Sequence, residues 1–197
     1  MNAVVDTFEF SPDNWARAET YIRRYPEGRQ ASAVLALLDL AQRQSSGWLP
    51  RAAIERVAEL LKMAPIRVYE VATFYEMFNL EPVGEHVVRV CTTTPCMLRG
   101  AGEVLVACKD ELQVEVRGTT DDGKFTLQEF ECLGACVNAP IVWIDDDFYE
   151  DLDGASIRDI LKRLRIGELP EPGSAKGRLT SAPASGPKTL TTGGTEG

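Results

Sequence analysis

The sequence predicts an α+β protein in which an N-terminal helical bundle precedes a small α/β domain and a low-complexity tail. Three observations predict this class. Residues 11–80 carry apolar side chains at helical spacing, and residues 86–166 change to short apolar or alternating runs. In the last 31 residues, 19 are Gly, Pro, Ser or Thr. We therefore expect domains at 1–82 and 83–166 and a tail at 167–197.

Four helices are expected in the first domain. Ser11 is a candidate N-cap, and Pro12 and Asp13 after it favour a helix start. Pro50 and Pro65 open two further helices. The four apolar stripes are Trp15, Ala18 and Ile22; Val34, Leu37, Leu38 and Ala41; Ile54, Val57, Ala58 and Leu61; and Val68, Val71, Ala72, Tyr75 and Phe78. Helices this short are marginal alone in water, so they should pack as a bundle.

The second domain is expected to have the order β-α-β-β-β-α. Its first strand, 86–90, ends at Cys91, and the first helix runs from Leu98 to Leu112. The later elements are a short strand at 114–117, a turn at Asp122–Gly123, strands at 125–131 and 141–144, an edge piece at Phe148–Tyr149, and a helix carrying Ile157, Leu161 and Leu164. This order is typical of a small α/β sheet.

The charge balance limits the classes of partner. The chain has 30 acidic and 21 basic residues, a net charge of -9. Nucleic acids and anionic membranes bind clustered Lys and Arg, so we expect neither as the main partner. No apolar run approaches the roughly 18 residues of a membrane span, and we expect no membrane insertion. The first ten residues contain Asp6 and Glu9 but no Lys or Arg, unlike a signal or transit peptide, which predicts a cytoplasmic protein.

Four of the five cysteines form two closely spaced pairs. Cys91 and Cys96 follow the first strand as C-x4-C, and Cys132 and Cys136 follow the strand before 141–144 as C-x3-C. Loops at neighbouring strand ends can converge, so four thiolates could surround one metal centre. An odd cysteine count in a reducing compartment argues against a disulfide framework.

The spacing of the pairs favours a [2Fe–2S] cluster and leaves zinc open. Structural zinc sites usually use C-x2-C, and thioredoxin-type dithiols need the same spacing, which is absent here. A [2Fe–2S] cluster takes two thiolates on each iron, and C-x4-C occurs in plant-type ferredoxins. Gly134 would let the backbone approach such a cluster, while Thr92, Thr93 and Thr94 could donate hydrogen bonds to its sulfurs. The single histidine, His86, excludes sites with several His ligands.

Two further features have a structural and a functional interpretation. Cys108 shares an apolar helix face with Val104 and Leu112, which predicts a small core residue.

Between Asp121 and Asp153 there are ten acids and one base. Carboxylates near a cluster would lower its reduction potential, whereas a solvated acidic face would only aid solubility. The sequence leaves this choice open.

Three motifs resemble a known family: Tyr69-Glu-Val-Ala-Thr-Phe-Tyr75, Cys91-Thr-Thr-Thr-Pro-Cys96-Met-Leu-Arg-Gly100, and Glu131-Cys-Leu-Gly-Ala-Cys-Val-Asn-Ala-Pro140. From about Phe8 to Ile166 the chain resembles the thioredoxin-like [2Fe–2S] ferredoxin subunits, the E subunits, of bacterial respiratory complex I, an NADH:quinone oxidoreductase. The resemblance implies a thioredoxin-like α/β second domain. It also implies that one [2Fe–2S] cluster is ligated by Cys91, Cys96, Cys132 and Cys136.

The resemblance further implies an electron-transfer subunit with no catalytic residue and no bond chemistry of its own. Its cluster would exchange single electrons with the FMN of a partner subunit, and FMN and NADH would bind to that partner rather than to this chain. Other peripheral-arm subunits are implied as neighbours, and the implied location is cytoplasmic, at the inner face of the cell membrane through the complex. Equivalent subunits serve NAD-linked hydrogenases and formate dehydrogenases, which these motifs do not separate.

Two other classes of function compete with electron transfer. The segment Ile54–Glu70 resembles the helix-turn-helix of a redox-sensing regulator. However, residues 51–80 carry four bases and four acids, and Glu70 and Glu76 lie in the would-be recognition helix, which is poor for DNA binding. The other alternative is a zinc-stabilised adaptor.

The tail is expected to have no fold of its own. It lacks aromatic residues, and few of its side chains can offset the cost of ordering Gly and Pro. The chain's own surface is therefore a poor docking site for the tail. The alternatives are a disordered tail or an extended segment docked on a neighbouring subunit through Lys176, Arg178 and Lys188.

Overall fold

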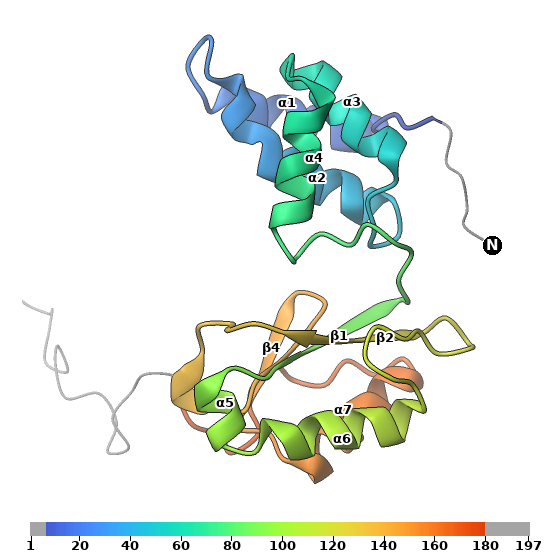
Figure 1. The fold of residues 1–197 in the computed structure, drawn as a ribbon, viewed down its shortest axis with the longest axis vertical. Helices are drawn as coiled ribbons and strands as arrows, with labels where there is room; N and C mark the ends of the chain where they lie inside the picture. The colour runs from blue at the N-terminus through green and yellow to red at the C-terminus, as the bar shows by residue number, and fades with distance from the viewer. Residues whose placement is uncertain (1–6, 180–197) are drawn as a thin grey trace, which may run out of the picture. The chain divides into compact units, whose positions relative to one another are not determined.

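The structure is a computed structural model that describes residues 7–179. The chain divides into two compact units between Glu85 and His86. Each unit has its own hydrophobic core and is described by itself (Figure 1).

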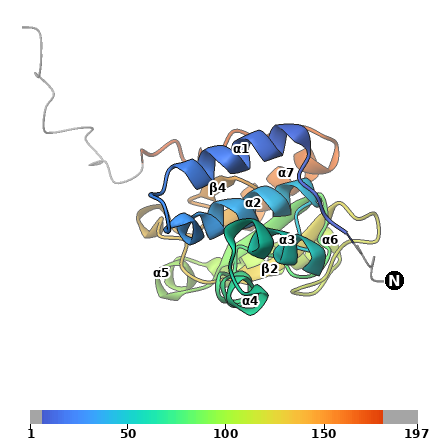
Figure 2. The same cartoon turned by 90° about the horizontal axis from the view of Figure 1, so that it is seen from above.

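The first unit is a bundle of helices. Its elements are α1 (Pro12–Arg23), the short 3-10 helix η1 (Gln30–Ala33), α2 (Val34–Gln44), α3 (Arg51–Leu61) and α4 (Pro65–Phe74). Figure 2 shows α1 beside α2, and these helices are in contact. The predicted stripes supply most of the core, whose fully buried members include Leu37, Leu38, Val57 and Val68. Two predicted stripe residues are wrong as core residues, because Trp15 is 37% exposed and Tyr75 is 40% exposed.

The helix starts follow the predicted signals. The Ser11 hydroxyl accepts a hydrogen bond from the Asn14 N–H at 3.3 Å and caps α1, while Pro50 and Pro65 stand at the starts of α3 and α4. The predicted stripe of the fourth helix is too long, because α4 ends at Phe74 and Tyr75 is extended. Phe78 lies beyond the helix but still packs in the core.

The second unit is a mixed sheet with helices. Its elements are β1 (His86–Cys91), α5 (Thr94–Leu98), α6 (Ala101–Leu112), β2 (Phe125–Phe130), the 3-10 turn η2 (Cys136–Asn138), β3 (Val142–Ile144), β4 (Asp147–Glu150), α7 (Gly154–Arg165) and β5 (Gly173–Ser174). In the described residues the strand order is β2-β1-β3-β4-β5. β1 pairs parallel with β2 and antiparallel with β3, β3 pairs antiparallel with β4, and β4 pairs parallel with β5.

Helices α6 and α7 lie together on one face of this sheet (Figure 1). Alternate residues of β1, Val88 and Val90, point to the helices and are fully buried. Ile157 and Leu161 of α7 complete this core. Cys91 is the last residue of β1, an inner strand of the sheet, so the first cysteine loop leaves from the end of that strand.

Two predicted elements of the second unit are wrong in detail. The helix expected from Leu98 to Leu112 is α6, which begins only at Ala101 because Gly100 before it adopts a left-handed φ of 104°. Leu98 is the last residue of the separate short helix α5, which was not predicted. The strand expected at 114–117 is a turn. Left-handed Gln113 and Arg117 bend the chain at both ends, and pairing with β2 begins only when the Arg117 N–H donates to the Leu127 carbonyl at 2.7 Å.

The expectation that the chain's own surface does not hold the tail is wrong for the C-terminal segment, which we define as residues 170–178. Its strand β5 adds to the sheet beside β4, and the Ala175 N–H donates to the Glu150 carbonyl at 2.9 Å. Arg178, expected to contact a neighbouring subunit, pairs with Asp151 instead. Lys188 lies in residues 180–197, which are outside the described residues.

The helices of both units are short. Within residues 7–179, none of them is long and apolar enough to cross a bilayer.

Candidate metal centre

The two cysteine pairs lie at the same end of two neighbouring parallel strands. Cys91 is the last residue of β1 and is paired in register with Phe130, the last residue of β2. Cys96 lies in α5, which starts two residues after Thr92, and the second pair lies in the loop after β2. We call residues 132–138 the second cysteine loop. Because parallel strands have their carboxyl ends at the same end of a sheet, both loops leave from that end.

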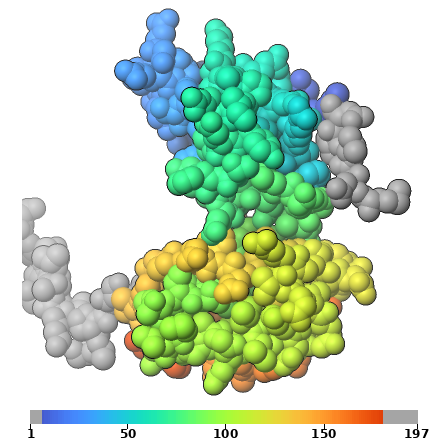
Figure 3. Space-filling model, in the orientation of Figure 1, coloured from blue at the N-terminus to red at the C-terminus, as the bar shows by residue number. Residues whose placement is uncertain are grey.

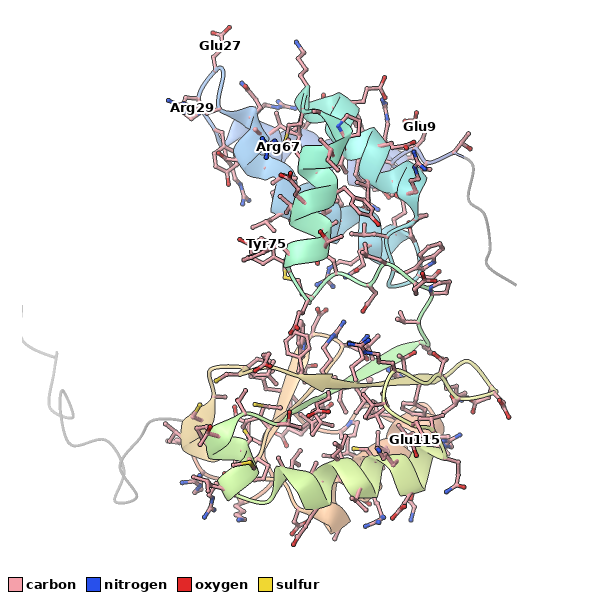
Figure 4. The ribbon with its side chains drawn as sticks, in the orientation of Figure 1. Glu9, Glu27, Arg29, Arg67, Tyr75 and Glu115 are labelled. Carbon is pink, nitrogen blue, oxygen red and sulfur yellow. The ribbon has the colours of Figure 1, made fainter. Side chains whose placement is uncertain are left out.

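The contacts of the sulfur atoms join the two loops. The Sγ atoms of Cys132 and Cys136 lie 3.5 Å apart, and Cys91 Sγ lies 3.3 Å from the Thr93 hydroxyl. Cys91 is also hydrogen-bonded to Cys96 and to the backbone of Leu133 in the other loop. In Figure 4, sulfur atoms gather where α5 meets the second cysteine loop. All four residues are free thiols.

The thiols of the first pair have opposite pKa shifts. Burial raises the pKa of Cys91, but hydrogen bonds from the Thr93 side chain and from the backbones of Leu133 and Thr93 outweigh it, so the net pKa is lowered. Burial, followed by the hydrogen bond to Cys91, raises the pKa of Cys96 to about 12. Both side chains are about 1% exposed. The first loop thus supplies donors that stabilise a thiolate at Cys91.

The thiols of the second pair, which is closer to the surface, also have opposite pKa shifts. The Gly134 backbone N–H, with Cys136 and the Thr93 hydroxyl, lowers the pKa of Cys132. Its partner Cys136 has a raised pKa, chiefly through the hydrogen bond with Cys132. Gly134 has a φ of 81°, and nothing lies within 4 Å of the place where a Cβ would stand. This conformation turns its N–H towards sulfur and leaves the adjoining space open.

The donor set fits a [2Fe–2S] cluster. Four thiols come from two loops, two from each, which matches the four thiolates that two irons require. Backbone and hydroxyl donors are already aimed at Cys91 and Cys132, as is usual around cluster sulfurs. No group of three or more His, Cys, Asp or Glu side chains suited to one metal ion is found among residues 7–179.

The three threonines predicted as donors have different partners. Thr93 contacts Cys91 and also lowers the pKa of Cys132, so one hydroxyl serves both loops. Thr92 donates instead to the carboxylate of Glu129 at 2.8 Å. No contact of the Thr94 side chain within the described residues supports the predicted role.

Cys108 lies apart from these thiols. It is fully buried in the core between the sheet and α6, which confirms its predicted packing role. Burial raises the pKa of its thiol to about 12. It therefore remains a neutral thiol at physiological pH.

The acidic stretch divides between the two ends of the sheet. Asp145 lies at the turn between β3 and β4, opposite the start of β1, where its carboxylate contacts His86. Glu150 and Asp151 lie at the other end of β4, against the second cysteine loop. Only part of the stretch is therefore near the thiols.

Sequence reasoning missed the residues behind the second cysteine loop. Asn138 is fully buried, and its Nδ2 donates to Glu150 at 2.8 Å. Arg178 donates to Asp151 and to the Val137 carbonyl. The motif containing Asn138 pointed to this loop, whereas Arg178 was expected to anchor the tail on a neighbouring subunit and not on this loop.

Fold and site together define a class: a thioredoxin-like protein with four thiols at two strand ends in place of a C-x-x-C dithiol. The chain belongs to the thioredoxin-like [2Fe-2S] ferredoxin family, whose family model matches residues 18–165. This membership supports an iron–sulfur cluster as its cofactor.

Named relatives extend over most of the chain. The E subunit of the NADH-quinone oxidoreductase of Rickettsia bellii is 53% identical over 165 residues, covering 84% of this chain and 99% of the relative. The mitochondrial NADH dehydrogenase [ubiquinone] flavoprotein 2 of Dictyostelium discoideum is 48% identical, covering 93% of this chain and 74% of the relative.

A solved structure shares the fold. The NAD+-reducing [NiFe]-hydrogenase in its H2-reduced state superposes with a TM-score of 0.57 at 18% identity, covering 66% of this chain and 22% of that chain. At this identity the likeness shows the fold alone.

Proposed function

We propose that this protein is the electron-transfer [2Fe–2S] subunit of an NADH:quinone oxidoreductase, with Cys91, Cys96, Cys132 and Cys136 as the cluster ligands. The observation that carries the proposal is the convergence of the two cysteine pairs at one sheet edge, with donors aimed at their sulfurs. The 53% identity to an E subunit over nearly its whole length supports the choice of assembly.

The residues around the thiols would have different roles in binding the cluster. When bound, a [2Fe–2S] cluster accepts and returns single electrons. Cys91 and Cys96 are buried and would keep water from one side, whereas Cys132 is exposed and would leave the other side accessible. Thr93 and Gly134 donate hydrogen bonds that favour the thiolate forms. No residue is assigned to bond chemistry, because all four thiols would serve as ligands.

The surface beside the thiols suits a protein partner. Met97 and Leu98 of α5 and Val137 of the second cysteine loop are large apolar side chains that are more than half exposed. Figure 3 shows the surface of α5, in light green, next to the orange surface of residues that follow β2. We infer that this surface packs on the subunit that binds FMN and NADH, and that the protein reaches the inner face of the membrane only through the complex.

The helix-turn-helix alternative finds little support on α4. Figure 4 labels Arg67, in the first turn of α4, and Tyr75, the residue just after its last turn. Arg67 is paired with Glu70 at 2.8 Å, and Phe74 is 77% exposed, so the helix presents a neutral and apolar surface. Such a surface favours protein contact over phosphate contact.

The metal content of the purified protein tests the cluster. Anaerobically purified chain should hold about two irons and two sulfides and give a paramagnetic signal when reduced. Replacing any of Cys91, Cys96, Cys132 or Cys136 by Ser should lose or weaken the cluster, whereas Cys108→Ala should keep it. Stoichiometric zinc without labile sulfide would contradict the proposal.

The parent assembly needs a separate experiment. An NAD-linked hydrogenase or formate dehydrogenase would use an equivalent subunit. Affinity purification from the native host should recover flavin and quinone-reducing subunits. Recovery of hydrogenase or formate dehydrogenase subunits would assign the other assembly and leave the cluster proposal intact.

A further inference from the structure

The C-terminal segment reaches the second cysteine loop through one side chain. The Arg178 guanidinium forms a two-point contact with Asp151, with Nη2 2.6 Å from Oδ1 and Nε 3.0 Å from Oδ2. Its Nη2 also donates to the Val137 carbonyl at 3.0 Å. Val137 is the residue directly after Cys136, so a residue of the tail contacts the peptide that follows a thiol ligand.

Asp151 also binds the same loop, through its backbone N–H. Its backbone N–H donates to the Asn138 carbonyl at 2.6 Å, while its side chain, only 1% exposed, accepts from Arg178. Two successive carbonyls of the loop, those of Val137 and Asn138, are thus bound by Arg178 and Asp151. A buried carboxylate held by a bidentate arginine has a fixed geometry.

The segment that carries Arg178 is itself fixed on the unit. Ser174 pairs in register with Glu150, and its hydroxyl lies 2.6 Å from Asp151 Oδ2. The Arg178 N–H donates to the same hydroxyl at 3.1 Å. The guanidinium is therefore presented to the loop by a hydrogen-bonded turn rather than by a free chain end.

We propose that Arg178 is a positioning residue for Cys136, fixing the second cysteine loop in the conformation that ligates the cluster. The alternative is that Arg178 only fastens the tail. The part of the inference that concerns the cluster rests on the proposed function. One arm of the test therefore measures the loop in the chain without a cluster.

The first arm measures amide hydrogen exchange in the full-length apo chain. Arg178→Gln should speed exchange of the Asn138 and Ala139 amides at least about tenfold, because a charge-assisted hydrogen bond to the loop is lost. The amides of α6 should be unchanged. Lys176→Gln is the matched control, since it removes a neighbouring positive charge from the same segment but no contact to the loop.

The second arm uses chain reconstituted with iron and sulfide. Arg178→Gln should speed cluster loss to a chelator about tenfold and alter the electron paramagnetic resonance spectrum of the reduced protein, while Lys176→Gln changes neither. A wild-type chain that never holds a cluster would refute the proposed function, and the exchange arm would still decide the role of Arg178.

Three results would overturn the inference. In one, Arg178→Gln speeds exchange of the Ala175 amide but not of the loop. In another, Lys176→Gln has the same effects as Arg178→Gln. If Arg178→Gln unfolds α6 as well, Ser174→Ala replaces it, and unchanged loop exchange in that folded variant would equally overturn the inference.

Discussion

The imidazole Nδ1 of His86, the first residue of β1, lies 2.6 Å from a carboxylate oxygen of Asp145. The other oxygen of Asp145 accepts from the Val87 N–H at 3.0 Å. Cys91 lies at the opposite end of the same strand, roughly 16 Å away at about 3.3 Å per residue. This distance exceeds the Debye length of about 8 Å at physiological salt. Asp145 therefore helps to fasten the sheet and is remote from the thiols.

Reduction potential should depend on which carboxylate is removed. Glu129 accepts from Thr92, the residue next to Cys91, so Glu129→Gln should raise the potential by about 20 mV or more at low salt. Asp145→Asn with Asp147→Asn should change it by less than about 10 mV. Redox titration followed by spectroscopy measures both. A larger shift in the double variant would place the acidic turn near the cluster, against the strand geometry.

The Thr93 hydroxyl should raise the potential of the cluster. Its hydrogen bonds favour negative charge on sulfur, so Thr93→Val should lower the potential by roughly 20–60 mV. Thr92→Val is the matched control because its hydroxyl donates to Glu129 instead. Equal shifts in the two variants would show that the effect is not a hydrogen bond to sulfur.

Replacing two glycines by alanine should change the stability of the chain in opposite directions. Gly134 has a φ of 81°, so Gly134→Ala should destabilise the chain by about 1 kcal/mol and slow cluster assembly. Gly102 lies inside α6 with nothing within 4 Å of a new Cβ, so Gly102→Ala should stabilise by about 0.5–1 kcal/mol. Denaturant unfolding measures both. A neutral Gly134→Ala would argue against backbone strain at this loop.

The C-terminal segment should detach in acid. The hydrogen bond from Arg178, acting against burial, lowers the pKa of Asp151 below its ordinary value near 3.9. The resulting stabilisation is present above that value and is lost as pH falls through the lowered pKa. Amide chemical shifts of Ser174 and Ala175 should therefore move only below about pH 4. In Asp151→Asn this acid transition should be missing, and its persistence would assign it to another carboxyl.

The sequence by itself determined the local elements and the chemical class of the site. Ser11, Pro50 and Pro65 predicted helix starts because capping and a preset φ act within one turn. The strand ending at Cys91 and the two cysteine spacings pointed to a thiol-ligated centre, because strand period and ligand spacing are local properties of a chain.

Only the tertiary structure decided where distant segments meet. A short strand was expected at 114–117, but left-handed Gln113 and Arg117 turn the chain away from the sheet. The tail contains too few apolar residues to predict any fold, yet Arg178 binds the buried carboxylate of Asp151. Such contacts depend on the register of β4 with β5 and on the burial of a partner far away in sequence. Neither quantity is encoded in the local composition of the segment.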